Sequence, residues 1–356
     1  MSKYLAYLHT IGFTQKNLSV IFETNSSYQE FFDNLSFENL AKLNLKDEKI
    51  FELMANYKKT DYSKIDATLE KNSVKIITLN DSSYPLLLRS IPHPPFLLYT
   101  RGIINNDFDL LSVVGSRKNT RYSQVVLEKF IPDLIKNNFG IVSGGAFGVD
   151  SLAHNITLNN SGYTLAIIGT GIDIDYPASN KALYEKIVEK GGVVISIFRL
   201  GTGPENYNFP IRNEIIAGMS SGTLVTEAGV GSGTLITARL ALELNRDVFV
   251  IPGEITKETS EGANRLIRDG LGKLVMTTED ILNEYNITFR TINAPEINFS
   301  DEIEKSIYNK LKESSLDASS IGDILGIDIE IIGYKLTIME IEGLIELSSS
   351  GTYNIK

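Results

Sequence analysis

Short apolar runs that end in glycine recur through the middle of this chain. The runs at 111–114, 140–142 and 165–168 are rich in Val, Ile and Leu, and glycine with Ser, Thr or Arg follows each one. Such runs predict buried strands of a parallel sheet, and the turns after them predict phosphate-binding loops at its carboxyl edge. Because helical patterns alternate with strands to about residue 282, residues 63–289 are predicted to form a doubly wound α/β domain.

The same pattern locates the individual elements of this domain. Lead-in strands are expected at 74–79 and 96–99, and later strands at 193–198, 222–226, 247–251 and 273–275. Helices are expected at 122–138, 149–159, 181–190, 212–220, 234–244 and 263–269.

The two ends of the chain have different patterns. Residues 1–62 show short helical segments with candidate N-caps at Ser27 and Ser36, which predict a small all-α domain of the SAM or helix-hairpin-helix kind. A structural appendage is the plainer interpretation of that domain. Residues 290–300 predict a linker, and residues 301–356 predict three helices and a hairpin, a winged-helix-like pattern.

The third of these C-terminal helices is poorly suited to reading a DNA groove. It begins Asp328-Ile-Glu330 and contains one lysine, Lys335. Contact with phosphates needs positive charge, so a protein-protein role is favoured for this domain.

Composition removes several classes of chemistry. The 356 residues are 42% apolar and 22% charged, and no apolar run approaches the roughly 18 residues of a membrane span. No signal-peptide pattern opens the chain, so a cytoplasmic protein without membrane association is expected. There is no cysteine, the three histidines are far apart, and no metalloprotease, nucleophile-elbow or Walker A motif occurs. No metal, no cofactor and no catalytic residue are therefore expected.

Charge is unevenly distributed along the chain. The formal net charge is −10, and residues 301–356 contribute 5 basic and 11 acidic side chains to it. Residues 71–300 carry 21 basic and 23 acidic side chains. Any nucleic acid should therefore bind a local patch in the middle of the chain.

Two glycine-rich turns offer the clearest phosphate chemistry. Gly115-Ser116-Arg117 places backbone N–H groups, a hydroxyl and a guanidinium at a strand end. Ser143-Gly144-Gly145-Ala146-Phe147-Gly148 lets the backbone approach a phosphate closely and precedes a helix. The alternative for both is a tight turn without a ligand.

Further candidates follow the third and later strands. Gly169-Thr170-Gly171 leads to Asp173 and Asp175, which more often cap or face solvent than bind Mg²⁺, and to Lys181, which either reaches a phosphate or is solvated. In Phe209-Pro210-Ile211-Arg212-Asn213, the Arg and Asn are backbone donors and the Phe offers a stacking face, although such a Phe is more often core. Glu227 precedes the turn at 229–234 and is either a catalytic carboxylate or an acid that holds neighbouring loops.

Several ordered motifs together carry a family resemblance. They are Gly-Ser-Arg at 115–117, the glycine-rich run at 143–150, Gly-Thr-Gly at 169–171, Phe-Pro-Ile-Arg-Asn at 209–213, Ser-Gly-Thr-Leu-Ile-Thr-Ala at 232–238 and Arg-Asp-Val-Phe-Val-Ile-Pro-Gly at 246–253. In this order and spacing they resemble the DNA-processing protein family known as DprA or Smf, over about residues 75–280.

This resemblance implies a fold and a function. It implies an extended Rossmann-like central domain that tends to dimerise, and a cytoplasmic protein without accepted catalytic activity. Such a protein binds and protects incoming single-stranded DNA and helps to load RecA recombinase during natural transformation. The DNA-binding residues predicted from the motifs and the resemblance are Gly115, Ser116, Arg117, Ser143, Gly144, Gly145, Ala146, Gly148, Gly171, Lys181, Arg199, Phe209, Arg212 and Asn213.

The chain departs from the family pattern at two places. It reads Ser196-Ile-Phe-Arg199 where the family usually has Ser-Glu-aromatic-Pro, and Glu214 where the family usually has a second arginine after Arg212-Asn213. Glu214 removes a positive charge beside the predicted groove, and Arg199 supplies one nearby.

A second hypothesis is a nucleotide-processing enzyme of the type that cleaves N-glycosidic bonds of nucleoside monophosphates. Related Rossmann-like enzymes carry a Gly-Gly-x-Gly-Thr turn followed by a Glu. Here Glu227 precedes Gly231-Ser-Gly-Thr234, and that order disfavours the enzyme.

Overall fold

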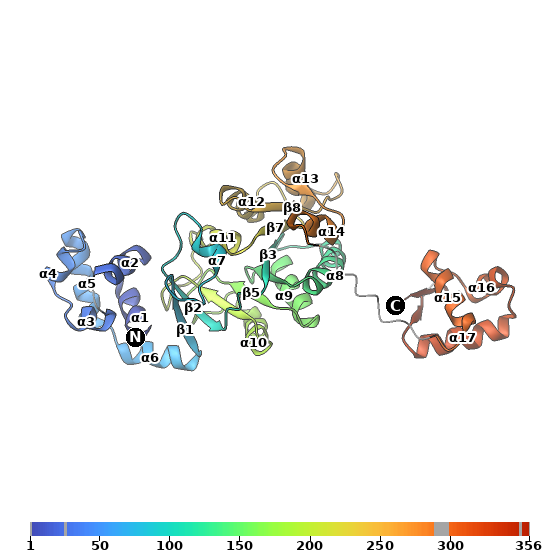
Figure 1. Cartoon of the computed structure of the whole chain (residues 1–356), viewed down its shortest axis with the longest axis horizontal. Helices are drawn as coiled ribbons and strands as arrows, with labels where there is room; N and C mark the ends of the chain where they lie inside the picture. Colours follow the sequence, from blue (N-terminus) through green and yellow to red (C-terminus); the bar gives the residue numbers. More distant parts are fainter. Residues whose placement is uncertain (1, 25–26, 288–298, 349–350, 356) are drawn as a thin grey trace. The chain divides into compact units, whose positions relative to one another are not determined.

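The structure, a computed structural model, divides into two units. They are Met1–Arg290 and Thr291–Lys356. The residues that it describes are 2–24, 27–287, 299–348 and 351–355 (Figure 1). The boundary predicted between residues 62 and 63 falls inside the first unit. Apart from residues 299 and 300, the linker predicted at 290–300 lies outside the described residues.

Short helices open the first unit and pack against one end of the sheet (Figure 1). They are α1 (Ser2–Ile11), α2 (Gln15–Thr24), α3 (Tyr28–Asp33), α4 (Phe37–Ala41), α5 (Asp47–Lys59) and α6 (Tyr62–Lys71). The predicted caps are confirmed, because the Ser27 and Ser36 hydroxyls accept backbone N–H groups of α3 and α4. The Gln15 side chain also donates to the Ile197 carbonyl at 2.9 Å, which joins α2 to the sheet.

A nine-stranded sheet forms the centre of the first unit. Its order is β1-β2-β6-β5-β4-β3-β7-β8-β9. The β1–β2 and β2–β6 pairs are antiparallel, and the pairs from β6 to β9 are parallel. The strands are β1 (Val74–Thr78), β2 (Leu97–Gly102), β3 (Asp109–Val114), β4 (Phe139–Ser143), β5 (Thr164–Ile167), β6 (Val193–Ser196), β7 (Gly222–Val225), β8 (Asp247–Val250) and β9 (Lys273–Leu274).

Helices cover both faces of this sheet, and the parallel strands β3 to β8 bury side chains on both sides. One face carries α8 (Arg121–Lys136), α9 (Val149–Asn159), α10 (Lys181–Glu189) and α14 (Thr278–Leu282). The other carries α7 (Leu86–Arg89), α11 (Asn208–Met219), α12 (Gly233–Glu243) and α13 (Glu258–Arg268). The described part of this unit also contains two short 3-10 turns, η1 (Ala178–Asn180) and η2 (Asn283–Tyr285). The predicted doubly wound, mostly parallel α/β fold is confirmed.

Four helices differ from the prediction. α13 begins at Glu258, five residues before the predicted start at Ala263, and the short α14 was not predicted. α11 begins at Asn208, four residues before the predicted start at Arg212, because Pro210 lies in its first turn, where the missing N–H has no helical partner to lose. The single turn α7 was not predicted, since four residues are too few to show a helical period.

The strand order creates a switch point between β3 and β7. The chain leaves β3 toward β4, β5 and β6 on one side, and returns to pair β7 with the other side of β3. The loops after β3 and β7 therefore diverge at the carboxyl edge of the sheet, where open α/β sheets bind their ligands.

The described residues of the second unit form three helices and an antiparallel pair of strands. They are α15 (Glu302–Glu313), α16 (Ala318–Leu325), α17 (Ile329–Ile341), β10 (Ile345–Leu347) and β11 (Tyr353–Ile355). The predicted three helices and hairpin are present, and the winged-helix classification stays a prediction. Within the parts of the chain that the structure describes, no helix has both the length and the apolar character of a membrane span.

Candidate nucleic-acid interface

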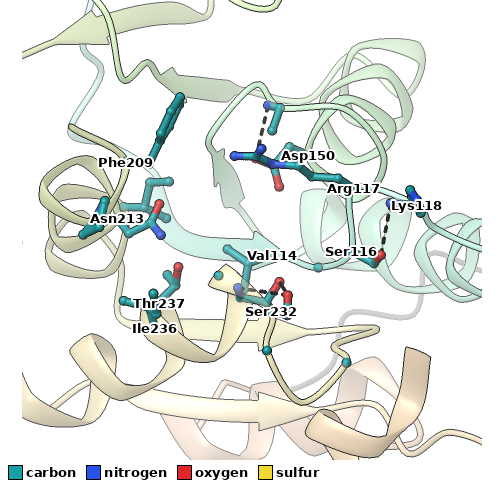
Figure 2. Close-up of a pocket in the computed structure, with 18 of the residues that line it drawn as sticks. Val114, Ser116, Arg117, Lys118, Asp150, Phe209, Asn213, Ser232, Ile236 and Thr237 are labelled. Atoms are coloured by element: carbon teal, nitrogen blue, oxygen red, sulfur yellow. Dashed lines mark hydrogen bonds between the residues drawn. The ribbon is translucent and has the colours of Figure 1, made fainter. Parts of the chain in front are cut away.

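A groove of about 740 Å³ opens at the switch point between β3 and β7. The loop after β3, the start of α9, the first turns of α11 and the glycine-rich loop before α12 line it (Figure 2). It is open to solvent and long enough to hold more than one polar group of a ligand.

The loop after β3 carries the exposed charge of the groove. Arg117 is exposed, and its guanidinium carbon lies 5.4 Å from the centroid of the Phe209 ring. The Ser116 hydroxyl accepts the Lys118 backbone N–H at 3.0 Å, so a tight turn sets the direction of the Arg117 side chain. Figure 2 shows Arg117 and Phe209 at the same end of the groove.

Gly148 allows the second predicted loop to lie directly against the first. Its φ is +78°, and a Cβ there would lie 2.3 Å from the Ser116 carbonyl oxygen. That carbonyl accepts the Val149 N–H at 3.2 Å, at the start of α9. The loops at 115–117 and 143–148 are therefore one structural unit, as adjacent strand ends predict.

Most of the 143–148 loop supports the groove from below. Ser143 is fully buried, and its hydroxyl donates to the Val113 carbonyl at 2.8 Å. The Gly145 carbonyl accepts from the Tyr184 hydroxyl at 3.0 Å and from the Asn180 amide at 2.9 Å. Only Ala146 of this loop lines the main groove.

Arg212 lies on the floor of the groove and is 5% exposed. Its guanidinium donates to the Gly144 carbonyl and, at 2.6 Å, to the Ile167 carbonyl. Nε donates to the Asn213 amide oxygen at 3.1 Å. Arg212 was predicted to contact DNA, but its hydrogen bonds hold the ends of β4 and β5 together. Its positive charge lies beneath the groove.

Asp150 is a buried carboxylate beside this arginine. It accepts the Ala146 N–H at 3.2 Å. Burial raises the pKa of Asp150, and the positive charges of Arg212 and Arg117 oppose that rise. Burial likewise lowers the pKa of Arg212, which Asp150 opposes. The groove floor is thus a compensated pair of charges, and Arg117 and Lys118 provide exposed positive charge at its rim.

Phe209 lies in an aromatic corner with Tyr176 and Phe147, and the sequence motif indicates only the Phe209 ring. The Phe209 ring is half-buried. Its centroid lies 5.9 Å from the centroid of the Tyr176 ring and 5.9 Å from the Arg212 guanidinium carbon. A smaller hollow of about 30 Å³ adjoins it, lined also by the exposed rings of Phe147 and Tyr176. Planar groups could stack on this corner next to Arg117.

Besides Ser143, Gly144, Gly145 and Gly148, three more predicted site residues do not line the groove. Gly171 is buried, and a Cβ there would lie 2.7 Å from the Arg199 carbonyl oxygen. Lys181 is exposed at the start of α10, with Glu185 at 3.9 Å. Arg199 is exposed after β6 and lines neither cavity. The segments after β5 and β6 bring these residues to the carboxyl edge of the sheet, two and three strands away from β3.

The groove also contains residues absent from the predicted set. They include Lys118, Asp150, Ser232, Thr237 and Glu258. Ser232 caps α12, since its hydroxyl accepts the Thr234 N–H at 3.2 Å (Figure 2). The signal was available in the glycine-rich turn after β7, which meets the β3 loop at the switch point.

Glu227 acts as a structural acid in this geometry. Its carboxylate accepts the Thr120 N–H at 2.9 Å, the Thr120 hydroxyl at 2.8 Å and the Ser123 hydroxyl. The Thr259 hydroxyl lies 3.4 Å away. Glu227 lines neither cavity at this edge. These hydrogen bonds hold the starts of α8 and α13 together. In the described parts of the chain, no three His, Cys, Asp or Glu side chains gather as a metal site.

Comparison with known proteins identifies the family. The family model described as DNA recombination-mediator protein A matches residues 75–286, and the chain belongs to this family. The resemblance carried by the glycine-rich and Phe-Pro-Ile-Arg-Asn motifs is therefore confirmed.

Relatives in several bacteria agree with this assignment. DNA processing protein DprA of Streptococcus pneumoniae is 41% identical over 62% of this chain and 78% of its own length. Protein Smf of Synechocystis is 38% identical over 60% of this chain, and Protein Smf of Escherichia coli is 37% identical over 65%. The matches span 54% and 62% of those two proteins.

Solved structures extend the similarity to three dimensions. The X-ray structure of DprA from Streptococcus pneumoniae matches 82% of this chain and 99% of its own, with 35% identity and a TM-score of 0.67. DNA processing protein A from Helicobacter pylori, described for its single-stranded DNA binding mode, matches 60% of this chain and 96% of its own, with 26% identity and a TM-score of 0.53.

Proposed function

We propose that this protein binds single-stranded DNA in the groove between the β3 and β7 loops. The observation that carries the proposal is an exposed arginine, Arg117, beside the half-buried Phe209 ring in an open groove. Arginine binds phosphate oxygens, and an aromatic face stacks on any base, so the pair suits an unpaired strand of varied sequence. The single-stranded DNA binding of the Helicobacter pylori relative supports the same ligand.

We also propose the cellular role that the family resemblance implies. The bound strand is incoming DNA in natural transformation, protected by this protein in the cytoplasm until RecA recombinase is loaded onto it. A homodimer formed through the Rossmann-like domain would place two grooves on one assembly. Family membership supports this role.

We propose that binding occurs without catalysis. Hydrogen bonds from Thr120 and Ser123 occupy the carboxylate of Glu227, the acid on which the N-glycosidase alternative depends. Release of a free base from a panel of nucleoside monophosphates, abolished by Glu227→Gln, would contradict this part of the proposal.

The direct test is fluorescence anisotropy with a labelled single strand of about 30 nucleotides, titrated at low and moderate salt against the same sequence as duplex. We expect tighter binding of the single strand, weakened by salt as phosphate contacts release counterions. Equal binding of both forms, or no binding at low salt, would reject the proposal and leave the fold unaffected.

A further inference from the structure

α17 in the second unit is apolar on two opposite sides. Ile332, Leu336 and Met339 are buried in the core of that unit. On the opposite side lies the α17 stripe, which we define as Ile331, Tyr334, Ile338 and Ile341. Of these, Ile331 is 46% exposed, Tyr334 64% and Ile341 78%, and Ile338 is half-buried. α17 runs along one side of the unit (Figure 1).

The spacing of the stripe is that of a helix-pairing seam. Its members follow one another by three, four and three residues, which places them at the a and d positions of two heptads. A helix that is apolar all round is normally covered on every side. An apolar row of this size on an exposed helix therefore marks a protein contact surface.

Negative charge flanks the stripe on both sides. Glu330 and Glu342 occupy the positions that border an a/d seam, and both are exposed. Neither carboxylate forms an ion pair with the residues described in the second unit, 299–348 and 351–355. The flanks are therefore free to attract a cationic partner.

The lysine in α17 does not offset the negative charge beside the stripe. Lys335 lies 2.8 Å from an Asp301 carboxylate oxygen and 2.9 Å from a Glu304 carboxylate oxygen. Its charge is neutralised by the unit itself. On α17, all of whose residues the structure describes, an anionic ligand such as DNA finds no free cation, and a second copy of α17 would bring carboxylates against carboxylates.

We propose that the α17 stripe docks an amphipathic helix of a partner protein, with apolar residues at heptad spacing and Lys or Arg along both edges. The inference is independent of the DNA groove, which lies in the other unit. Burial of the four apolar side chains supplies affinity, and the basic edges supply orientation and selectivity.

A pair of designed peptides tests the proposal on the full-length chain. Both are helical, about three heptads long, with Leu at a and d; one has Lys at the flanking positions and the other Glu. We expect the lysine peptide to bind at least about tenfold more tightly at low salt, and the preference to shrink as salt screens the flanks. Equal affinity for both peptides, or no binding of either, would overturn the proposal.

Matched variants locate the binding site. Tyr334→Ala should weaken the lysine peptide about tenfold, because exposed aromatic anchors dominate such interfaces. Ile329→Ala is the control, since it removes an exposed side chain of the same helix outside the stripe. Glu330→Gln with Glu342→Gln should abolish the preference for lysine while leaving the apolar contact.

Two other outcomes would also reject the proposal. If Tyr334→Ala changes the sedimentation coefficient of the protein alone, the occupant is a second copy. If it weakens DNA binding instead, α17 is a nucleic-acid surface. Circular dichroism of each variant confirms that the unit is folded.

Discussion

Arg117 and Arg212 border the same ring, Phe209, but differ in burial and in hydrogen bonding. Arg117 is exposed at the rim, while Arg212 is 5% exposed and donates to the Gly144 carbonyl just after β4 and to the Ile167 carbonyl at the end of β5. An exposed guanidinium exchanges water for a phosphate at low cost, whereas a buried one already has its partners. Replacing Arg117 should therefore reduce DNA binding, whereas replacing Arg212 should reduce the stability of the fold.

Arg117→Ala should weaken single-stranded DNA binding by about tenfold and lower the salt slope by about one unit, because one phosphate contact is lost. The melting temperature should stay at the parent value, since the side chain is exposed. Lys181→Ala is the matched control: it removes an exposed charge from the same sheet edge outside the groove. A loss in the Lys181 variant equal to that of Arg117→Ala would show that the strand follows another path.

Arg212→Ala should destabilise the protein by about 3 kcal/mol, because the buried Gly144 and Ile167 carbonyls lose their donor and Asp150 loses its compensating charge. Denaturant unfolding at neutral pH measures this free energy. Arg212→Lys should recover only part of it, since an ammonium lacks the planar fork that reaches two acceptors. Parent-like stability of Arg212→Ala would mean that these hydrogen bonds contribute little.

The sequence motifs identified both arginines but did not show that one is exposed and the other buried. Each lies beside a glycine- or proline-containing turn, and burial depends on which side chains the other strands supply. Phe209 illustrates the same point, because its partners Tyr176 and Arg117 are distant in sequence. Residue types at the groove could be predicted, and their exposure could not.

At the scale of elements, the groove depends on how closely the β3 loop and the start of α9 approach. Gly148 has a φ of +78°, and only glycine leaves room for the Ser116 carbonyl there. The position of Arg117 therefore depends on a glycine 31 residues further along the chain. A change at that glycine should act on DNA binding through the loop.

Gly148→Ala should displace the 115–117 loop, destabilise the protein by about 2 kcal/mol and weaken single-stranded DNA binding. Gly201→Ala is the control, because Gly201 also has a positive φ of +75° but a Cβ there would meet no atom within 4 Å. Thermal unfolding and DNA-binding anisotropy are measured on both variants. Both variants strain the backbone at a positive φ, and only Gly148→Ala also brings a Cβ against the Ser116 carbonyl. Parent-like DNA binding by Gly148→Ala would show that the loop does not need this contact.

The bounds of helices and strands could be predicted where the apolar residues repeat regularly over a long segment. They were harder to predict near proline. The helix expected at 149–159 is α9 with the same bounds, whereas proline within the first turn hid the true start of α11. The order of the strands was beyond the sequence, since β7 pairs with β3 across more than 100 intervening residues. That pairing is what creates the groove.

At the scale of the whole molecule, two buried histidines connect stability to pH. His9 joins α1 to β2, with Nδ1 3.0 Å from the Tyr99 hydroxyl and the two rings stacked. Burial, with help from the charge of Arg199, lowers the pKa of His9 to about 4. His154 in α9 lies 2.8 Å from the Thr164 hydroxyl, and burial together with Arg212 lowers its pKa to about 3.

Both histidines are neutral in the folded protein near neutral pH. As pH falls below about 6.5, the unfolded chain takes up protons that the folded chain excludes, so stability decreases until the folded pKa is reached. The difference for His9 between pH 6.5 and 4 corresponds to about 3 kcal/mol. Protonation of the buried Asp150, whose pKa is raised, favours the folded state as pH falls and offsets part of this loss.

His9→Gln should therefore flatten the acid side of the stability profile, because glutamine keeps a polar group near Tyr99 without a proton-binding site. Denaturant unfolding of parent and variant at pH 7, 5.5 and 4.5 measures the effect as a difference, so contributions from the carboxylates cancel. The variant should lose some stability at pH 7, where the stacked ring is missing, and approach or exceed the parent as pH falls. Parallel profiles for the two proteins would show that His9 accepts a proton in the folded state, and that the contact between α1 and β2 is open to water.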